Sequence, residues 1–398
     1  MSTRGVSEIF VALLTLGLSS PTFAFLELEA PSASFELRGT IRVSEEALQP
    51  LFEGPLATST TQSAGSLRLI ADVRFLDTLR LEAHGVQSVS GLTHSVSMLG
   101  ELRETDRLEL TNLQRDTTHT RIALELDRLS IAFSAAPFDL TIGRQPINFA
   151  TAQMFTPNDL FSPFSAQTFY RIYKPGVDAA RLDVELAELS SLTVVGVLGY
   201  DAFGDPDPIR STGLIRALFP LSIVEVSGFI GRVRDGWIAA AGIQGELFET
   251  LGIRGEAQLL DGPNGFVFEG ALGVERRFES TWFLRAEYLV HGAGAASKDG
   301  YVAAATRRTG LPYLGRHYSA LGAGYELTAL AMLDSVLIIN WIDPSALVAV
   351  YLTYSLLDEA EAALSVSVPL GRSPNGLELE SELGTYPLSV SGEVRCYF

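Results

Sequence analysis

Short segments in which apolar and polar residues alternate recur along almost the whole chain. In the segment 265–276, for example, apolar residues or glycine hold the even positions from 266 to 274, while Glu269 and Glu275 lie at odd positions. A period of two places successive side chains on opposite faces of a β-strand, and helical spacing does not fit it. We expect strands near 34–43, 66–76, 79–89, 121–133, 138–147, 177–186, 190–199, 211–219, 221–232, 236–247, 250–260, 265–276, 280–291, 316–326, 334–342, 345–355, 361–369 and 387–398.

The connections between these eighteen segments fall into short and long ones. The long ones are 44–65, 90–120, 148–176, 200–210, 292–315 and 370–386. Counted along the chain, all six are odd-numbered, so an antiparallel sheet would carry all of them at one end. Short periplasmic turns, long extracellular loops and an even strand number are typical of a bacterial transmembrane barrel. The predicted fold is therefore all-β, a single transmembrane antiparallel β-barrel of about 18 strands, with 16 as the alternative.

A soluble β-sandwich is the main competing fold. Its polar face would meet water, and such domains are usually shorter than these 398 residues. In a bilayer every backbone polar group needs a partner inside the protein, and a sheet provides one only by closing on itself. No segment offers the run of about 18 apolar residues that a spanning helix needs. A barrel of eighteen strands also leaves a lumen too wide for wall side chains alone to fill.

The N-terminus has the order of a secretory signal peptide. A basic start is followed by the apolar run 9–18 and by small residues up to Ala24. We expect residues 1–24 to be removed and residues 25–398 to form the barrel. The single cysteine, Cys396, then has no partner for an intramolecular disulfide and is interpreted as a small lipid-facing side chain.

The net charge and the absence of known catalytic and metal-binding motifs argue against several functions. The formal charge of −18 argues against nucleic acid as a partner. The five histidines are scattered without zinc-site spacing, and neither a nucleophile elbow nor a phosphate-binding loop is present. We therefore expect no enzyme, no metal and no cofactor. The same overall charge gives a weak expectation of cation preference for a channel.

The last strand carries a resemblance to a known class of proteins. Apolar residues or glycine alternate with polar ones up to an aromatic end, at Leu388, Val390, Gly392, Val394, Cys396 and Phe398. This resembles the C-terminal strand of the outer-membrane proteins of Gram-negative bacteria, whose terminal phenylalanine is recognised by the barrel-assembly machinery. The resemblance implies that Phe398 is the assembly signal, and that the chain lies in the outer membrane beside lipid and lipopolysaccharide.

The third long connection, 148–176, is rich in proline and aromatic residues, which predicts a structured loop folded against the inner wall. Its flanks, Gly143-Arg144-Gln145 and Asp178-Ala-Ala-Arg181-Leu182, resemble those of porin-like barrels related to the alginate-export type. The resemblance covers about 40 residues. It implies a passive or substrate-selective channel in which the loop narrows the pore. Candidate pore residues on this basis are Arg144, Gln145, Asp159, Lys174, Asp178 and Arg181. The alternative is that they only pin the loop to the wall.

Inward-facing charges divide the predicted lumen into two walls. Because closure places the last strand beside the first, one wall combines Arg38, Arg42, Arg68, Arg74, Arg80 and Arg395 with four acids, Glu36, Asp72, Glu82 and Glu393. On the tenth to thirteenth strands the acids outnumber the arginines, and the candidates there are Glu256, Glu269 and Glu287. The two walls would set up a transverse field that orients polar solutes. The alternative is that neighbouring charges pair and cancel.

Three functions remain open from the sequence. The first is a porin-like channel for small polar solutes. The second is an export or uptake channel for an anionic polysaccharide or another specific ligand. The third is a barrel without transport function, either an enzyme or a surface attachment protein with a plugged lumen.

Overall fold

A computed structural model of the chain describes residues 26–50, 59–76, 78–92, 107–108, 111–117, 119–161, 163, 165–166, 169, 173–201, 203–262, 265–301, 311–374 and 379–398. The predicted signal peptide, 1–24, lies outside the described residues. The strands are β1 (Leu26–Ala30), β2 (Ala33–Gln49), β3 (Thr60–Phe75), β4 (Leu79–Leu92), β5 (Thr111–Asp116), β6 (Thr120–Ala135), β7 (Phe138–Gln145), β8 (Val177–Ala187), β9 (Ser190–Val197), β10 (Thr212–Leu221), β11 (Val224–Val233), β12 (Gly236–Leu247), β13 (Leu251–Gly262), β14 (Gly265–Arg277), β15 (Trp282–His291), β16 (His317–Thr328), β17 (Ala331–Asn340), β18 (Ser345–Leu357), β19 (Ala360–Leu370) and β20 (Leu388–Tyr397). Two 3₁₀ turns, η1 (Lys298–Gly300) and η2 (Leu383–Thr385), lie in connections.

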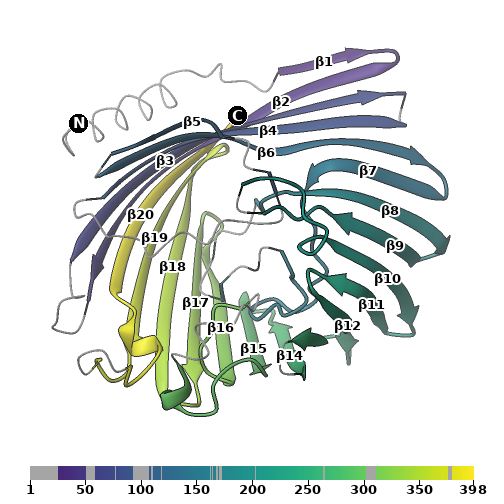
Figure 1. Cartoon of the computed structure of the whole chain (residues 1–398). Coiled ribbons are helices and arrows are strands. Elements are labelled where there is room, and N and C mark those ends of the chain that lie inside the picture. The colour runs from purple at the N-terminus through teal and green to yellow at the C-terminus, as the bar shows by residue number, and fades with distance from the viewer. Residues whose placement is uncertain are drawn as a thin grey trace.

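The strands form one antiparallel sheet that closes on itself (Figure 1). Neighbours along the chain pair in order from β6 to β20, β2 pairs with β3, β3 with β4 and β4 with β6, and β20 pairs with β2. The prediction of an antiparallel barrel of 18 strands is confirmed, because β1 and β5 lie outside this ring. β1 pairs with the start of β2, and β5 pairs with 121–125 on β6.

The six long connections join strands at one end of the barrel, as the sequence predicts. They join β2 to β3, β4 through β5 to β6, β7 to β8, β9 to β10, β15 to β16 and β19 to β20. The turns at the other end are short, such as the one between Phe75 and Leu79 or between Leu221 and Val224. These ends are called the long-loop end and the short-turn end below.

The two faces of the sheet differ in chemistry. On β14, Phe268 and Leu272 are 46% and 65% exposed, whereas Glu269, on the opposite face, is 2% exposed. The same alternation gives an outer surface of exposed Leu, Ile, Val and Phe and an inner surface with most of the buried polar groups. Contact with hydrocarbon rather than water would stabilise such an outer surface. Among the described residues, no helix has the length and hydropathy of a membrane span.

The ring closes where β20 meets β2. Tyr397 lies opposite Thr40, and the Phe398 amide and carbonyl exchange hydrogen bonds with the Gly39 carbonyl and amide at 3.0 and 2.6 Å. The Phe398 ring lies over Gly39, so that a Cβ on this residue would lie 2.2 Å from the ring. Beyond that point β1 continues along the same edge of β2, with Leu26 opposite Leu37. β20 and β1 thus lie end to end and together cover the edge of β2.

We predict that Gly39→Ala weakens this closure, because the new methyl group displaces the Phe398 ring. Overpacking of this kind costs about 1–3 kcal/mol. Urea unfolding of the protein refolded in detergent, followed by its mobility on unboiled gels, measures the effect. Gly196→Ala on β9 is the matched control, since a Cβ there meets open space. Equal unfolding midpoints for the two variants would contradict the prediction.

Candidate functional site

The connection between β7 and β8, residues 146–176, is called the lumen loop here, and its described residues lie inside the barrel (Figure 1). Its described residues contact inward-facing side chains on opposite parts of the wall. The Thr151 amide meets Glu256 on β13, the Phe169 ring stacks on Tyr351 of β18 at 5.0 Å, and the Tyr173 hydroxyl lies 3.1 Å from Thr40 Oγ1 on β2. The loop therefore crosses the lumen from one wall to the other.

Two buried carboxylates hold the first half of the lumen loop by its backbone. Glu256 accepts hydrogen bonds from the amides of Thr151, Ala152 and Asn158 at 2.5, 2.8 and 2.8 Å. Glu287 on β15 accepts the next three amides, those of residues 153–155, at 2.8, 2.9 and 2.8 Å. Both glutamates are less than 7% exposed. Charge-assisted hydrogen bonds are about twice as strong as neutral ones, so these two side chains fix the segment 151–158 to the wall.

Aromatic side chains seal the space between this segment and the wall. Phe155 is fully buried, and its ring lies 5.5 Å from the ring of Tyr313 and 6.3 Å from that of Tyr318. Closer to β7, the Phe149 ring lies 5.5 Å from the Phe229 ring on β11. These contacts bury Phe149 and Phe155, which explains why the described part of the loop is rich in aromatic residues.

The second half of the loop is held by charged and cation–π contacts. Lys174 forms a buried ion pair with Asp159 within the loop. Burial lowers the pKa of Lys174, and the charge of Asp159 and their hydrogen bond oppose this. The Arg68 guanidinium lies 4.4 Å from the centre of the Tyr173 ring, and Arg128 donates to the Lys174 carbonyl at 2.8 Å. Asp159 and Lys174 are therefore brought together as a pair that holds the loop's own shape.

Arg144 and Asp178 lie in the wall where β7 leaves the sheet. Arg144 is 3% exposed; its Nε donates to Asp178 on β8 at 2.8 Å, and its Nη1 donates to the Leu126 carbonyl on β6 at 2.8 Å. That carbonyl lies between the stretches of β6 that pair with β7 and with β5. The guanidinium thus links β6 and β8 beyond the point where β7 ends. Gly143, whose φ of +119° suits glycine, precedes the arginine at this bend.

Gln145 and Arg181 also have partners in the wall. The Gln145 amide donates to the carbonyls of Thr141 and Ala179 at 3.0 and 3.2 Å. Arg181 pairs with Asp183 two residues along β8, at 2.6 Å. Arg181 has the most accessible side chain of the six candidates around the lumen loop, at about one third exposed, and the other five are more buried.

The six arginines predicted to share one wall, here called the arginine wall, lie on β2, β3, β4 and β20, and their charges are paired. Asp72 on β3 receives Arg80 at 2.6 Å and Arg74 at 3.2 Å, while Glu393 on β20 receives Arg42 at 2.6 Å. The remaining pairs are Arg38 with Glu36, Arg68 with Asp127, and Arg395 with Glu361 and Glu393. Charges therefore pair locally at this wall, as the alternative interpretation proposed.

The two partners in these pairs differ in exposure. The side chains of Arg38, Arg42, Arg74 and Arg80 are 42–58% exposed, whereas those of Asp72 and Glu393 are 2% and 5% exposed. The carboxylates lie beneath the guanidinium groups. Although the charges balance, the cationic ends are the more accessible members of these pairs.

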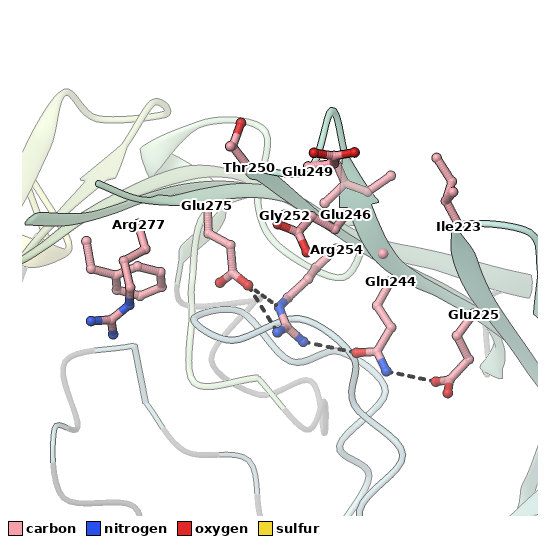
Figure 2. Close-up of a pocket in the computed structure, with 13 residues that line it drawn as sticks. Ile223, Glu225, Gln244, Glu246, Glu249, Thr250, Gly252, Arg254, Glu275 and Arg277 are labelled. Carbon is pink, nitrogen blue, oxygen red and sulfur yellow. Dashed lines mark hydrogen bonds and ion pairs between the residues drawn. The ribbon is translucent and has the colours of Figure 1, made fainter. Parts of the chain in front are cut away.

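The opposite wall contains both buried and accessible acids. Glu269 is 2% exposed and lies between His291 at 2.8 Å and the Gln258 amide at 2.7 Å, so it stays within the wall. Nearer the short-turn end, a recess of about 630 Å³ is lined by Glu225, Glu246, Glu249, Glu275, Arg254 and Arg277. Figure 2 shows Arg254 between Glu275 and Gln244, with Gln244 donating in turn to Glu225 at 2.8 Å. Acids exceed arginines in this recess.

A polar cluster at the long-loop end was not selected from the sequence. Glu382, before η2, accepts the Tyr318 hydroxyl and, at 2.8 Å, the Asn340 amide. Its own amide donates to Asp343, which also receives the Tyr301 hydroxyl at 2.6 Å. Burial raises the pKa of Glu382, and the hydrogen bond from Tyr318 opposes this. The cluster joins the connections β15–β16, β17–β18 and β19–β20. The sequence feature that could have indicated it is Asn340, a polar residue at the end of an apolar strand.

The described residues contain no group of three or more His, Cys, Asp or Glu side chains that could hold a metal ion. Cys396 is a free thiol, half-buried, opposite Ala360 and Ile41 in the sheet.

Comparison with known proteins identifies the fold. No protein-family model matches the chain, and no curated protein matches it in sequence. Among solved structures, Acinetobacter baumannii OccAB4 has a TM-score of 0.56 at 10% identity, over 92% of this chain and 98% of that one. Pseudomonas aeruginosa OccK8 (OprE) has a TM-score of 0.55 at 8% identity, over 92% and 98%. A triple mutant of Rhodopseudomonas blastica porin has a TM-score of 0.48 at 10% identity, over 92% and 100%. The first two similarities extend over nearly the full length of both chains, so this chain has the barrel fold of OccAB4 and OccK8.

We predict that Glu287→Ala releases the lumen loop locally, because three buried amides lose their acceptor. A buried amide left without a partner costs about 1–3 kcal/mol, so exchange of amides 153–155 should accelerate about ten-fold or more. Hydrogen exchange measured by mass spectrometry on the detergent-solubilised barrel tests this. Glu246→Ala is the control, since Glu246 is an exposed acid of the same wall. Unchanged exchange in 150–158 would show that packing alone holds the loop.

Proposed function

We propose that this chain is a porin-like channel of the bacterial outer membrane that passes small polar solutes past the lumen loop and the exposed side chains of the arginine wall. The observation that carries the proposal is a loop fixed across the lumen of a barrel whose outside is apolar. Such a loop narrows an aqueous path and leaves charged groups along its sides.

The outer-membrane location is supported by the exposed apolar face and by the barrel fold shared with OccAB4 and OccK8. On this proposal the long-loop end faces outward and the short turns face the periplasm. The relation to alginate-export barrels rests on the segment from Gly143 to Leu182 alone.

A second candidate is a channel that prefers anionic solutes, including acidic polysaccharides. Exposed guanidinium groups over buried carboxylates favour it, because a passing anion meets Arg42 and Arg80 before their partners. The overall charge of −18 favours cations instead. However, salt screens charges that lie more than about 10 Å from a passing ion, so most charges of the chain have little effect on it. The local arrangement therefore has the greater weight.

Single-channel recording in planar bilayers tests the proposal. We expect steady, ohmic conductance from the full barrel. A barrel that inserts and folds without steady current would overturn the channel function and leave a plugged barrel, either an enzyme or an attachment protein. Adding a polyuronate to one side distinguishes the candidates, since block of the current indicates an anionic polymer as ligand.

We predict that replacing Arg42 and Arg80 together by serine lowers the ratio of anion to cation permeability, because their carboxylate partners then face the lumen. A change of about two-fold or more in this ratio is expected. The reversal potential in a potassium chloride gradient measures it. The matched control is Arg232→Ser, an exposed arginine on the outer face of β11 at the long-loop end. A double variant that retains the unmodified protein's reversal potential would rule out a role for this wall in selectivity.

A further inference from the structure

The outer face of the barrel carries an apolar groove across β14 to β17 at the short-turn end. It has a volume of about 580 Å³. Small side chains form its floor, with Ala323 paired between Leu284 on β15 and Ser335 on β17. Larger ones flank it, since Val274, Leu284 and Leu321 are exposed on the same face. A row of small residues between larger ones explains why the surface is hollowed there.

An arginine lies at the rim of this groove, on the face that the proposed function places against lipid. Arg276 lines the groove, is exposed and lies opposite Leu284 in the sheet. Its guanidinium lies 4.9 Å from the centre of the Phe278 ring. The ion pairs of the described residues do not include Arg276, whereas nearby Arg254 pairs with Glu275 on the inner face. A cation on a lipid-facing surface is costly unless an anion meets it or it reaches the interface.

Aromatic residues indicate the membrane depth of Arg276. Trp282 and Tyr325 are cross-strand neighbours on the same face, with ring centres 4.6 Å apart. Such pairs lie at the level of lipid headgroups. Trp282 is two residues before Leu284, the partner of Arg276, so the guanidinium lies next to this aromatic level. Phosphate is the anion present at that depth, and guanidinium binds it through paired hydrogen bonds.

We infer that Arg276 and the groove across β14 to β17 form a binding site for one phospholipid of the periplasmic leaflet, with the phosphate on Arg276 and an acyl chain over Ala323. This inference rests on the proposed membrane location but not on conductance. Charge complementarity favours lipid over a second copy of the chain, because a purely apolar contact would leave the guanidinium without an anion.

Native mass spectrometry of the full barrel, refolded without lipid and then incubated in detergent with dipalmitoyl phosphatidylglycerol, tests the site. The unmodified protein should retain one phosphatidylglycerol. Arg276→Ala should retain about ten-fold less, and Arg276→Lys an intermediate amount, because lysine keeps the charge without the paired geometry. Ala323→Leu, which fills the floor, should also lose the lipid. Dipalmitoylglycerol, which lacks the phosphate, should not be retained.

Arg277→Ala is the matched control, because Arg277 is the next residue on β14 and lines the inner recess. Mobility on unboiled gels shows that each variant is folded. Retention by Arg276→Ala equal to that of the unmodified protein, or equal retention of dipalmitoylglycerol, would overturn the site. Cross-linking from residue 323 to a second copy would do the same. Lipid retention by a barrel without conductance would refute the channel and leave the lipid site, whereas conductance without retention would refute the site alone.

Discussion

The backbone hydrogen bonds between β20 and β2 are the interaction on which the rest of the structure depends. A sheet with an open edge would expose rows of unpaired amides and carbonyls, which hydrocarbon does not tolerate. Closure removes both edges at once, and β1 covers the same edge of β2 on the other side of Gly39, back to the start of β2 at Ala33. Once the ring is closed, the period of two assigns every side chain to the outside or the lumen.

Within the ring, acidic side chains serve mainly as anchors. Glu256 and Glu287 bind the backbone of the lumen loop, Asp72 and Glu393 lie beneath arginines, and Glu382 joins three connections. Burying a carboxylate is costly unless hydrogen bonds or opposite charges meet it, and each of these has several partners. The interior therefore combines acids that hold the structure with guanidinium groups that remain in contact with water.

The barrel could be predicted from the sequence because strand pattern and connection parity are local properties. Each of the eighteen barrel strands overlaps a segment expected from the sequence, but β2 runs on to Gln49 and β3 begins at Thr60, both inside the predicted connection 44–65. β1 and β5 were missed, since segments of five or six residues give little periodicity. Charge pairing depends on cross-strand register, and the bulge beside Asp127 on β6 shifts that register without a sequence signal. In an undistorted strand, Arg144 would lie on the same outer face as apolar Leu140 and Ile142. Its burial follows from the bend at Gly143, where β7 leaves the sheet. Backbone amides have no side-chain signature, which is why the anchoring role of Glu287 was not foreseen.

On the proposed channel function, the way in which the lumen loop is held has a consequence for how the protein can diversify. Glu256 and Glu287 bind main-chain amides, which every residue except proline supplies. Side chains at several of these positions can therefore change while the loop stays hydrogen-bonded to the wall. Recombination or laboratory evolution could thus alter what the passage accepts by exchanging loop side chains, with the wall left untouched.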